Sequence, residues 1–283
     1  MNIKKDLGSI IISDARNFNA QDIFECGQIF RYSATDEGYK VLSKDKSATV
    51  SKRNDDIVIT TDDTDYFYNF FDLSTDYNAI CDRLSMSNPI MNDSVAFGRG
   101  IRILNQDLTE MIFSFIISAN NNIKRIQSII ERICAKLGKA TPYGYAFPTV
   151  EALASVTPRE YEELGCGYRA KYIYKTAQDL LNFDVNQLRH MDTSTARARL
   201  LNFMGVGPKV ADCILLFGLH RSDTFPVDTW IKKVYHNYFE TGLADNKISE
   251  YFLDTFGQDA GYAQQYLFYF QRKYRQSIEN ELK

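Results

Sequence analysis

The stretch Leu201-Asn-Phe-Met-Gly-Val-Gly-Pro-Lys-Val-Ala-Asp212 predicts a tight turn between two helices. Gly205 and Gly207 flank Val206, and glycines in such a turn let backbone N–H groups approach an anion such as phosphate. Lys209 falls in the first turn of the helix expected over residues 209–219. The positive end of the helix dipole disfavours an ammonium group there, which favours a nucleophilic amine.

A carboxylate follows in Phe225-Pro-Val-Asp228, one helix and a short loop beyond Lys209. That length of chain is enough to return Asp228 to the amine. Each residue also has a purely structural interpretation. Lys209 alone would be a solvated surface charge, and Asp228 is a good N-cap for the helix expected from Thr229. The prediction of a nucleophilic lysine with a carboxylate beside it depends on the turn, Lys209 and Asp228 occurring together in this order.

A second segment, Phe113-Ser-Phe-Ile-Ile-Ser-Ala-Asn-Asn-Asn-Ile-Lys-Arg125, contains three consecutive asparagines. Asparagine is a poor helix former and a good turn residue, so this run should separate helices over residues 107–118 and 123–137. The result is a tight loop that carries amide side chains. A well-capped turn without a ligand is the structural alternative.

These segments resemble the 8-oxoguanine DNA glycosylase family, from the lysine-bearing branch of the helix-hairpin-helix DNA glycosylases. Three further stretches carry the resemblance, which spans roughly residues 24–270: Cys26-Gly-Gln-Ile-Phe-Arg31, Gly165-Cys-Gly-Tyr-Arg-Ala-Lys171 and Gly261-Tyr-Ala-Gln-Gln-Tyr-Leu-Phe268. The resemblance implies a bifunctional enzyme that removes 8-oxoguanine from duplex DNA, preferentially opposite cytosine. Excision would proceed through a lysine Schiff base and β-elimination, which nicks the strand.

The resemblance also assigns roles to residues. Lys209 and Asp228 would be catalytic. The base pocket would consist of the Gly27 carbonyl at N7, Gln264 at the Watson–Crick edge, Phe268 and Cys213 on the two faces, and Pro226 in the wall. On the residues alone, Phe268 and Cys213 have the helical spacing of core residues, and Gly27 is a candidate helix stop.

Further roles concern the DNA around the flipped nucleotide, which such enzymes extrude from the stack. Asn120 would fill the gap, Tyr168 would wedge the opposite strand, and Arg125 and Arg169 would contact the orphaned cytosine. Core packing for Tyr168 and phosphate contacts for the arginines are the alternatives. Phosphate contacts are implied for Gly205, Gly207 and Lys171, and a monovalent cation for the carbonyls of Leu201, Phe203 and Val206.

Composition indicates an ordinary soluble chain of 283 residues with 45% hydrophobic and 24% charged residues. No apolar run reaches the ~18 residues of a membrane span, and the N-terminus lacks an apolar signal core. We therefore expect a monomer inside the cell with its DNA, in the cytoplasm and nucleoid of a prokaryote or the nucleus of a eukaryote. The five widely spaced cysteines cannot form a four-cysteine iron–sulfur cluster, and no cofactor is required.

The formal net charge of −3 hides an asymmetry. Residues 1–98 contain 10 basic and 16 acidic side chains, a net −6, whereas residues 99–283 contain 23 and 20, a net +3. Because DNA affinity depends on cations that meet phosphates, the C-terminal part should face the DNA. Its expected basic face consists of Arg169, Lys171, Lys175, Arg197, Arg199 and Lys209.

The apolar pattern predicts an α+β fold. Short alternating runs at residues 9–12, 29–34, 39–43, 48–52 and 57–60 indicate an antiparallel meander, and helical spacing begins at Thr64. We expect an antiparallel sheet domain over residues 1–98, which contributes to the base pocket. An all-helical glycosylase unit should follow over residues 99–283, with its helix-hairpin-helix at about residues 196–219.

Two residues depart from the family pattern. Trp230 stands two residues past Asp228, where animal members have a histidine, and Gln271 stands where an aspartate is expected. In the relatives, that histidine and that aspartate form a pair. Their joint replacement by Trp230 and Gln271 suggests that this protein contacts the local phosphate differently. The alternatives are an alkylated-base glycosylase, which normally lacks the lysine, and a non-catalytic hairpin module that binds DNA.

Overall fold

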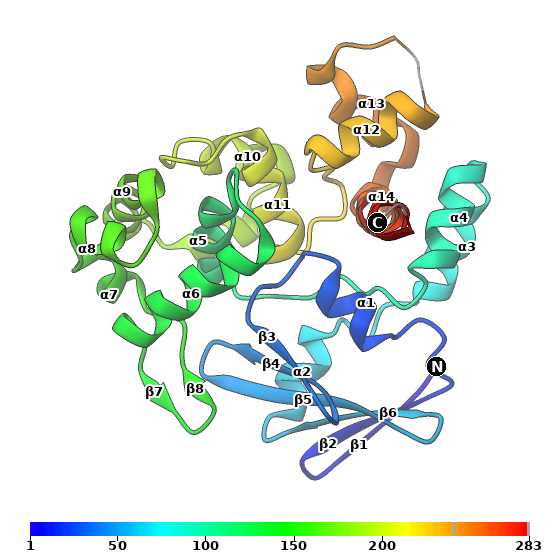
Figure 1. Ribbon diagram of the computed structural model, residues 1–283, viewed down its shortest axis with the longest axis horizontal. Coiled ribbons are helices and arrows are strands. Elements are labelled where there is room, and N and C mark those ends of the chain that lie inside the picture. Colours follow the sequence, from blue (N-terminus) through cyan, green and yellow to red (C-terminus); the bar gives the residue numbers. More distant parts are fainter. Residues whose placement is uncertain (240–241, 282–283) are drawn as a thin grey trace.

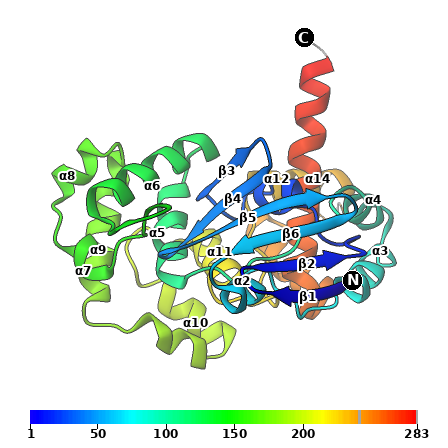
Figure 2. The same cartoon turned by 90° about the horizontal axis from the view of Figure 1, so that it is seen from below.

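The computed structural model describes residues 1–239 and 242–281, with side chains up to residue 273. The N-terminal part is a six-stranded antiparallel sheet in the order β1-β2-β6-β5-β4-β3 (Figures 1 and 2). Its strands are β1 Asn2–Asp6, β2 Ser9–Ser13, β3 Tyr32–Thr35, β4 Gly38–Ser43, β5 Lys46–Arg53 and β6 Asp56–Thr61. This confirms the expected meander.

The register places apolar residues opposite each other on the buried face. Val41 pairs with Ala48, and Val50 pairs with Ile59, and all four side chains are buried. Strand β1 was not predicted, because this edge strand is mostly polar and pairs with β2 alone among the described strands. Residues 29–31, expected in a strand, lie outside β3, which begins at Tyr32.

Helices make up most of the remaining chain (Figure 1). A small hairpin of β7 Ala140–Thr141 and β8 Gly144–Tyr145 interrupts them and was not anticipated. The helices are α1 Ala20–Glu25, α2 Thr64–Phe70, α3 Tyr77–Ser85, α4 Pro89–Phe97, α5 Leu108–Ser118, α6 Ile123–Leu137, α7 Val150–Ala154, α8 Pro158–Glu163, α9 Ala170–Leu180, α10 Thr193–Leu200, α11 Pro208–Gly218, α12 Thr229–Tyr238, α13 Ile248–Phe256 and α14 Ala260–Glu281. The expected α+β architecture is confirmed.

Two apolar cores organise the fold. The first holds buried residues of the sheet, α1 and α2, up to Leu73, together with Leu104. The second contains the buried faces of α3 through α14, which begin at Tyr77. Helices α3 and α4 therefore pack with the helical part of the chain, and the domain boundary at residue 98 stays a prediction.

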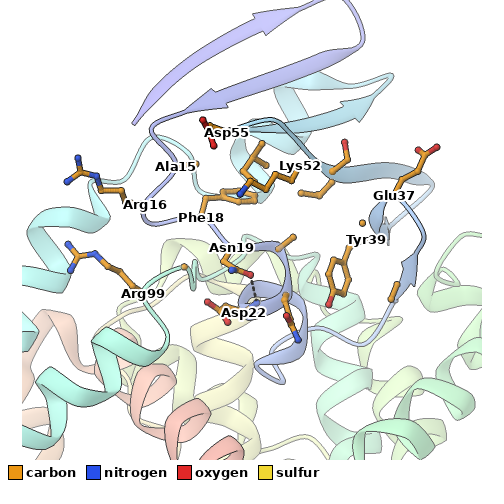
Figure 3. Close-up of a pocket in the computed structure, with 18 of the residues that line it drawn as sticks. Ala15, Arg16, Phe18, Asn19, Asp22, Glu37, Tyr39, Lys52, Asp55 and Arg99 are labelled. Atoms are coloured by element: carbon orange, nitrogen blue, oxygen red, sulfur yellow. Dashed lines mark hydrogen bonds between the residues drawn. The ribbon is translucent and has the colours of Figure 1, made fainter.

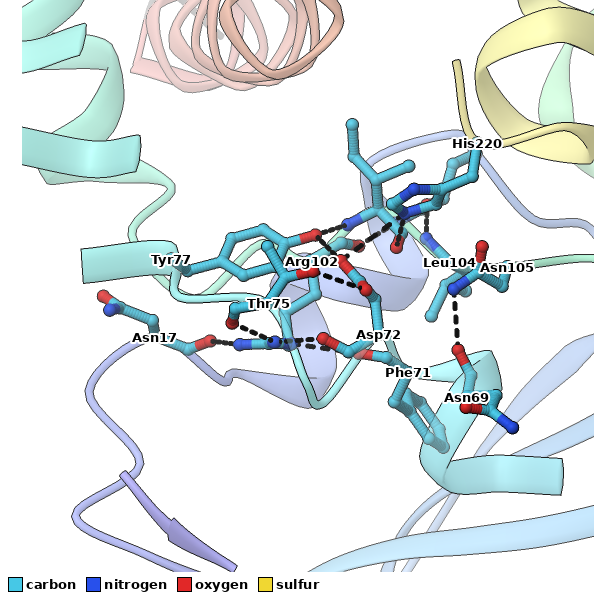
Figure 4. A network of polar contacts seen from close by, with 12 residues as sticks. Asn17, Asn69, Phe71, Asp72, Thr75, Tyr77, Arg102, Leu104, Asn105 and His220 are labelled. Carbon is cyan, nitrogen blue, oxygen red and sulfur yellow. Dashed lines mark hydrogen bonds and ion pairs between the residues drawn. The ribbon is translucent and has the colours of Figure 1, made fainter. Parts of the chain in front are cut away.

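A polar network around buried Arg102 joins the two cores (Figure 4). Its guanidinium donates to the carbonyls of Phe71, Asp72, Thr75 and Asn17, all from the first part of the chain. Asp72 accepts from Tyr77 at 3.0 Å and lies 3.5 Å from His220, directly beyond α11. The network thus fixes the end of the helix that carries Lys209 relative to the sheet.

A second buried ionic cluster lies beneath α5. Arg31 Nη1 and Glu110 Oε2 are 3.9 Å apart, and neither atom has a hydrogen-bond partner among the described residues. Burial raises the pKa of Glu110 from 4.5 to about 7, although the charge of Arg31 opposes the rise. A raised carboxyl pKa means that the native state holds the proton more tightly than the unfolded chain. The contribution of Glu110 to the free energy of unfolding is therefore fully present below pH 4.5, and it is lost as the pH rises through about 7.

We expect Glu110→Gln to remove this pH dependence. Relative to the unmodified protein, the free energy of unfolding of the variant should rise by up to about 3 kcal/mol between pH 5 and 8. Urea unfolding at several pH values measures this difference. Arg31 keeps its ion pair with Glu131 in this variant, and any constant loss of stability from the missing Glu110 charge cancels in the comparison across pH. Parallel stability curves for the two proteins would contradict the assignment.

No helix among the described residues is long and apolar enough to cross a membrane.

Candidate active site

A cavity of about 700 Å³ lies between α1, α5, α6, α11 and α14. It brings together four of the predicted site residues, Gly27, Lys209, Asp228 and Phe268, from widely separated parts of the chain. Its remaining lining includes Phe30, Phe115, Asn121, Asn122, Trp230 and Arg272. An amine, a carboxylate and an aromatic wall therefore share one recess.

Lys209 lies in the first turn of α11, as the sequence predicts. Its Nζ is 5.4 Å from the centroid of the Phe115 ring, which stacks on Phe217. One turn further along α11 is Cys213, whose thiol is 4% exposed. Burial raises the pKa of Cys213 to about 11, although the charge of Lys209 opposes the rise. The thiol is therefore neutral near pH 7, so it does not compete with the lysine as a nucleophile.

Asp228 has the capping geometry that the sequence allowed and also faces the cavity. Its Oδ1 accepts the backbone N–H groups of Trp230 and Ile231, each at 2.9 Å, as the N-cap of α12. Desolvation raises the pKa of its carboxyl, while the capping amides and the charge of Lys209 lower it. The capping role and a place beside Lys209 thus coexist in one side chain.

The hairpin between α10 and α11 owes its shape to two different glycines. Gly205 has a φ of 87°, and a Cβ there would lie 2.7 Å from the Cβ of Tyr172, so only glycine fits. Gly207 is the N-cap of α11 with an ordinary φ of −88°, and a Cβ would meet nothing within 4 Å. This open space leaves the N-terminal backbone of α11 accessible, as phosphate binding requires.

An ion pair joins the two helices of the hairpin. Arg197 Nε of α10 donates to Asp212 Oδ1 of α11 at 2.5 Å, and Asp212 is buried. Lys175 pairs with Asp179 on the surface of α9, so Arg197 and Lys175 each have an acidic partner within the chain rather than forming a free basic face. Lys171 is exposed on α9, where its predicted phosphate contact is sterically open.

Of the five residues predicted for the base pocket, Gly27 and Phe268 line the cavity. Gly27 follows the C-cap residue of α1 with a φ of 88°, and a Cβ there would lie 3.2 Å from Phe268. The helix-stop and pocket interpretations of Gly27 therefore coexist. Gln264 is buried, and its Oε1 accepts no hydrogen bond from the described residues. Gln264, Cys213 and Pro226 are buried beside the cavity rather than on its lining.

The asparagine loop separates α5 from α6 as expected. Asn122 caps α6 by accepting Arg125 N–H, and Asn121 donates to the Ile117 carbonyl, so the capped-turn interpretation holds for these two residues. Asn120 and Asn122 are both exposed, but Asn120 alone of the three has a positive φ, 48°, in the strained left-handed region. Of the three asparagines, Asn120 has the position that a gap-filling residue needs.

Tyr168 and Arg169 hold this loop from the facing turn. Tyr168 is 53% exposed, so its alternative as a core residue is wrong, and its hydroxyl donates to the Ala119 carbonyl at 3.1 Å. Arg169 is buried and donates through Nε and Nη2 to the Ala119 and Asn120 carbonyls. The contact of Arg169 with cytosine stays a prediction, because these nitrogens already have protein partners. Arg125, in contrast, is exposed.

The carbonyls of Leu201, Phe203 and Val206 belong to the hairpin turn. The Phe203 carbonyl also accepts the Val206 amide at 3.1 Å, which leaves a second lone pair. Oxygen donors of this kind suit a monovalent cation. Among the described residues, no group of three or more His, Cys, Asp or Glu side chains could hold a metal ion.

Sequence reasoning gave no role to several residues of the cavity. Phe30 and Phe115 belong to the motifs quoted above, so the sequence could have indicated that they line the site. Their rings meet edge to face. Arg272 was not singled out, and nothing in the local sequence marks it. Of the two departures, Trp230 lines the cavity, whereas Gln271 is buried and its Oε1 has no partner among the described residues.

A larger hollow of about 810 Å³ lies between the sheet and α1 (Figure 3). Its lining includes Arg16, Asp22, Tyr39, Asp55 and Arg99. Asp22 pairs with Tyr269, and Tyr39 pairs with Glu25. The hollow contains none of the predicted site residues, so size alone does not identify the active site.

Two family models match the chain in succession. Residues 10–112 match the 8-oxoguanine DNA glycosylase N-terminal domain, and residues 113–254 match the HhH-GPD superfamily base excision DNA repair proteins. The fold and the hairpin thus define a helix-hairpin-helix base excision repair protein. The chain belongs to the 8-oxoguanine DNA glycosylase family within that superfamily.

Individual relatives agree with this assignment. The N-glycosylase/DNA lyase OGG1 of Arabidopsis thaliana is 35% identical over 65% of this chain and 55% of its own length. The N-glycosylase/DNA lyase of Saccharomyces cerevisiae is 38% identical over 54% of this chain and 45% of its own length. The aligned part is thus about half the length of these curated relatives.

A solved structure matches nearly the whole chain. The 8-oxoguanine glycosylase/lyase of Clostridium acetobutylicum, in complex with duplex DNA that contains cytosine opposite 8-oxoG, has a TM-score of 0.91 and 38% identity. The alignment covers 97% of this chain and 99% of that one. A 3-methyladenine DNA-glycosylase of Archaeoglobus fulgidus, at 16% identity and a TM-score of 0.76, shares the fold alone.

Proposed function

We propose that this protein is a bifunctional DNA glycosylase and AP lyase that removes 8-oxoguanine from duplex DNA. The observation that carries the proposal is the meeting of Lys209, Asp228, Gly27 and Phe268 around one cavity of about 700 Å³. Family membership supports the same substrate class. An alkylated-base glycosylase would not need the lysine, and a non-catalytic module would not need an assembled pocket.

The chemistry follows from the two catalytic candidates. The amine of Lys209 attacks C1′ of the flipped nucleotide, and the bond from C1′ to the base nitrogen breaks. The ionised carboxylate of Asp228 stabilises the positive charge that develops on the sugar. The sugar ring of this adduct then opens: the C1′–O4′ bond breaks, O4′ takes a proton, and C1′ and Nζ form a Schiff base. Loss of a proton from C2′ of the Schiff base eliminates the 3′ phosphate, which nicks the strand.

Selection of the oxidised base rests on Gly27. Only 8-oxoguanine carries a hydrogen on N7, so a carbonyl directed there gains a hydrogen bond with the lesion and repels the lone pair of guanine. Discrimination of this kind is worth on the order of a few kcal/mol in a dry site. Phe268 and Cys213 would contact the two faces of the base, and the unpartnered Gln264 Oε1 would accept from its N–H groups.

Opposite-base choice would come from the loop that surrounds Asn120. We propose that Asn120 fills the gap and that Tyr168 wedges the opposite strand. Exposed Arg125 would donate to cytosine, whose O2 and N3 are acceptors. Arg169 would donate to cytosine only if its guanidinium gave up a hydrogen bond to the carbonyl of Ala119 or Asn120. Adenine presents an N6–H donor instead, so excision opposite cytosine should be faster.

The hairpin and α9 would bind the DNA backbone. Gly205, Gly207 and Lys171 would contact phosphate, and a monovalent cation at the Leu201, Phe203 and Val206 carbonyls would bridge the hairpin to the DNA backbone. The chemistry above requires no other cofactor. We propose that the protein acts as a monomer inside the cell, on its DNA.

Borohydride trapping tests the proposal. A duplex with 8-oxoguanine opposite cytosine should yield a covalent protein–DNA adduct, because borohydride reduces a lysine Schiff base to a stable amine. The same lesion opposite adenine should react about 10- to 150-fold more slowly, the effect of one lost charge-assisted hydrogen bond. A guanine duplex is the control. No adduct with the lesion would reject the function, and equal rates for the two opposite bases would reject the cytosine contacts alone.

A further inference from the structure

Arg272, on α14, is a buried side chain with unused hydrogen-bond donors. It is 9% exposed, and its Nε and Nη1 have no hydrogen-bond partner among the described residues. Only Nη2 donates, to the carbonyl of Glu25 at the end of α1. Buried N–H groups of an arginine are costly to leave unpaired, so an acceptor from outside the chain is the natural partner.

The unpaired donors lie at the cavity that holds Lys209. Arg272 lines this cavity, and its guanidinium carbon is 5.3 Å from the centroid of the Phe268 ring. A Cβ on Gly27 would lie 3.1 Å from Arg272 Nη1 and 3.2 Å from Phe268 Cε1. Gly27, Phe268 and one free N–H of Arg272 therefore meet at a single corner.

Helical spacing defines which edge of a bound base this corner faces. Gln264, Phe268 and Arg272 are four residues apart in succession, so they follow one face of α14. A base stacked on Phe268 would lie between Gln264 and Arg272. With Gln264 at the Watson–Crick edge, Arg272 and the Gly27 carbonyl face the edge that contains N7.

That edge of an oxidised guanine presents a donor between two acceptors. N7–H can donate to the Gly27 carbonyl, and the flanking oxygens O6 and O8 remain as acceptors. A guanidinium N–H beside Gly27 matches a carbonyl oxygen next to N7. The charged head of Arg272 also suits the electron-rich oxygen of an oxopurine better than an amino group, which is itself a donor.

We propose that Arg272 is a specificity-determining residue that donates a hydrogen bond to a carbonyl oxygen flanking N7 of the flipped base, either O6 or O8. This inference rests on the proposed function. It adds a second hydrogen bond that recognises the oxidised base, beside the one accepted by the Gly27 carbonyl. It predicts that the enzyme favours oxidised purines with an oxygen at the contacted position.

Arg272→Met tests the contact, because methionine keeps the apolar length of the side chain and removes the donors. Single-turnover excision of 8-oxoguanine should fall about 10- to 100-fold, the effect of a lost charge-assisted hydrogen bond. Trapping on an abasic duplex, which has no base to read, should change less than about 2-fold because Lys209 is intact. Arg159→Met, an exposed charge on α8, is the matched control and should leave both rates unchanged.

Two further lesions identify the oxygen. 8-Oxohypoxanthine keeps O6 and O8, whereas 8-oxoadenine keeps O8 and has an amino group at C6. A loss for 8-oxoguanine and 8-oxohypoxanthine but not for 8-oxoadenine assigns O6, and an equal loss for all three assigns O8. Comparing the variant with the unmodified protein on each base cancels the separate contribution of Gln264.

Other outcomes overturn the inference. They are unchanged excision of 8-oxoguanine, or abasic trapping that falls in parallel with excision. Thermal unfolding checks the fold, and if the methionine variant is unfolded, Arg272→Gln, which is shorter and uncharged but polar, takes its place. Wild-type rates in that variant also refute the contact. Failure of the proposed function looks different, because the unmodified protein would then be trapped on neither the lesion nor the abasic duplex.

Discussion

Replacing Lys209 by glutamine should abolish excision of 8-oxoguanine and the borohydride-trapped adduct, while lesion-duplex binding stays largely intact. The amide keeps much of the length of the side chain but is not a nucleophile, and buried Cys213, whose thiol is neutral near pH 7, cannot replace it. We expect single-turnover excision to fall by at least about 10³-fold. Single-turnover kinetics and a gel-shift titration measure the two properties separately.

Lys136→Gln is the matched control for this variant. Lys136 is a half-exposed lysine in the last turn of α6 and lies 3.9 Å from Glu160, away from the cavity. The control loses one positive charge and should retain both excision and trapping. Normal excision by Lys209→Gln would refute the Schiff-base mechanism, whereas loss of DNA binding together with excision would indicate that Lys209 acts chiefly as a phosphate contact.

Asp228→Asn should lower excision by on the order of 10²- to 10³-fold without unfolding the protein. The substitution removes the negative charge that faces the developing cation on the sugar. Asparagine is also a good N-cap, so its side-chain oxygen can still accept the N–H groups of Trp230 and Ile231. Thermal unfolding and single-turnover excision should therefore separate the structural and chemical roles of this residue.

The pH dependence of this variant provides an independent check. Desolvation raises the pKa of Asp228, so the ionised form that catalysis needs is lost at a higher pH than for an ordinary aspartate. The unmodified enzyme should show an acid limb in its pH–rate profile, and Asp228→Asn should lack it. If the asparagine variant instead melts at a much lower temperature and keeps its residual rate, the capping role dominates.

The hairpin illustrates what local sequence can predict. Gly205 needs a positive φ, Pro208 begins α11, and Lys209 follows in its first turn, all through interactions within a few residues. The same holds for Asn122 and Asp228, which cap the helices that begin directly after them. Such features depend on backbone conformation and on neighbours one turn away, so a single sequence contains them.

The partners of the arginines could not be predicted in this way. Arg169 is a family-type residue beside an expected DNA contact, yet it is buried and binds the carbonyls of Ala119 and Asn120. The polar strand β1 also escaped prediction, because its only stabilising pairing is with β2 and its side chains have no strong apolar alternation. Both features, the partners of Arg169 and the pairing of β1, concern contacts rather than local conformation.

The sequence by itself determined the class of fold, the hairpin, and the places of Lys209 and Asp228 at the starts of their helices, because turns, caps and apolar periodicity are local properties. The tertiary structure alone decided that Arg272 meets Gly27 and Phe268, and that this corner shares a cavity with Lys209. These residues are far apart along the chain, and only the packing of α1, α11 and α14 in the folded protein brings them together. The physical reason is that long-range contacts depend on how entire apolar faces fit together, which no short stretch of sequence specifies.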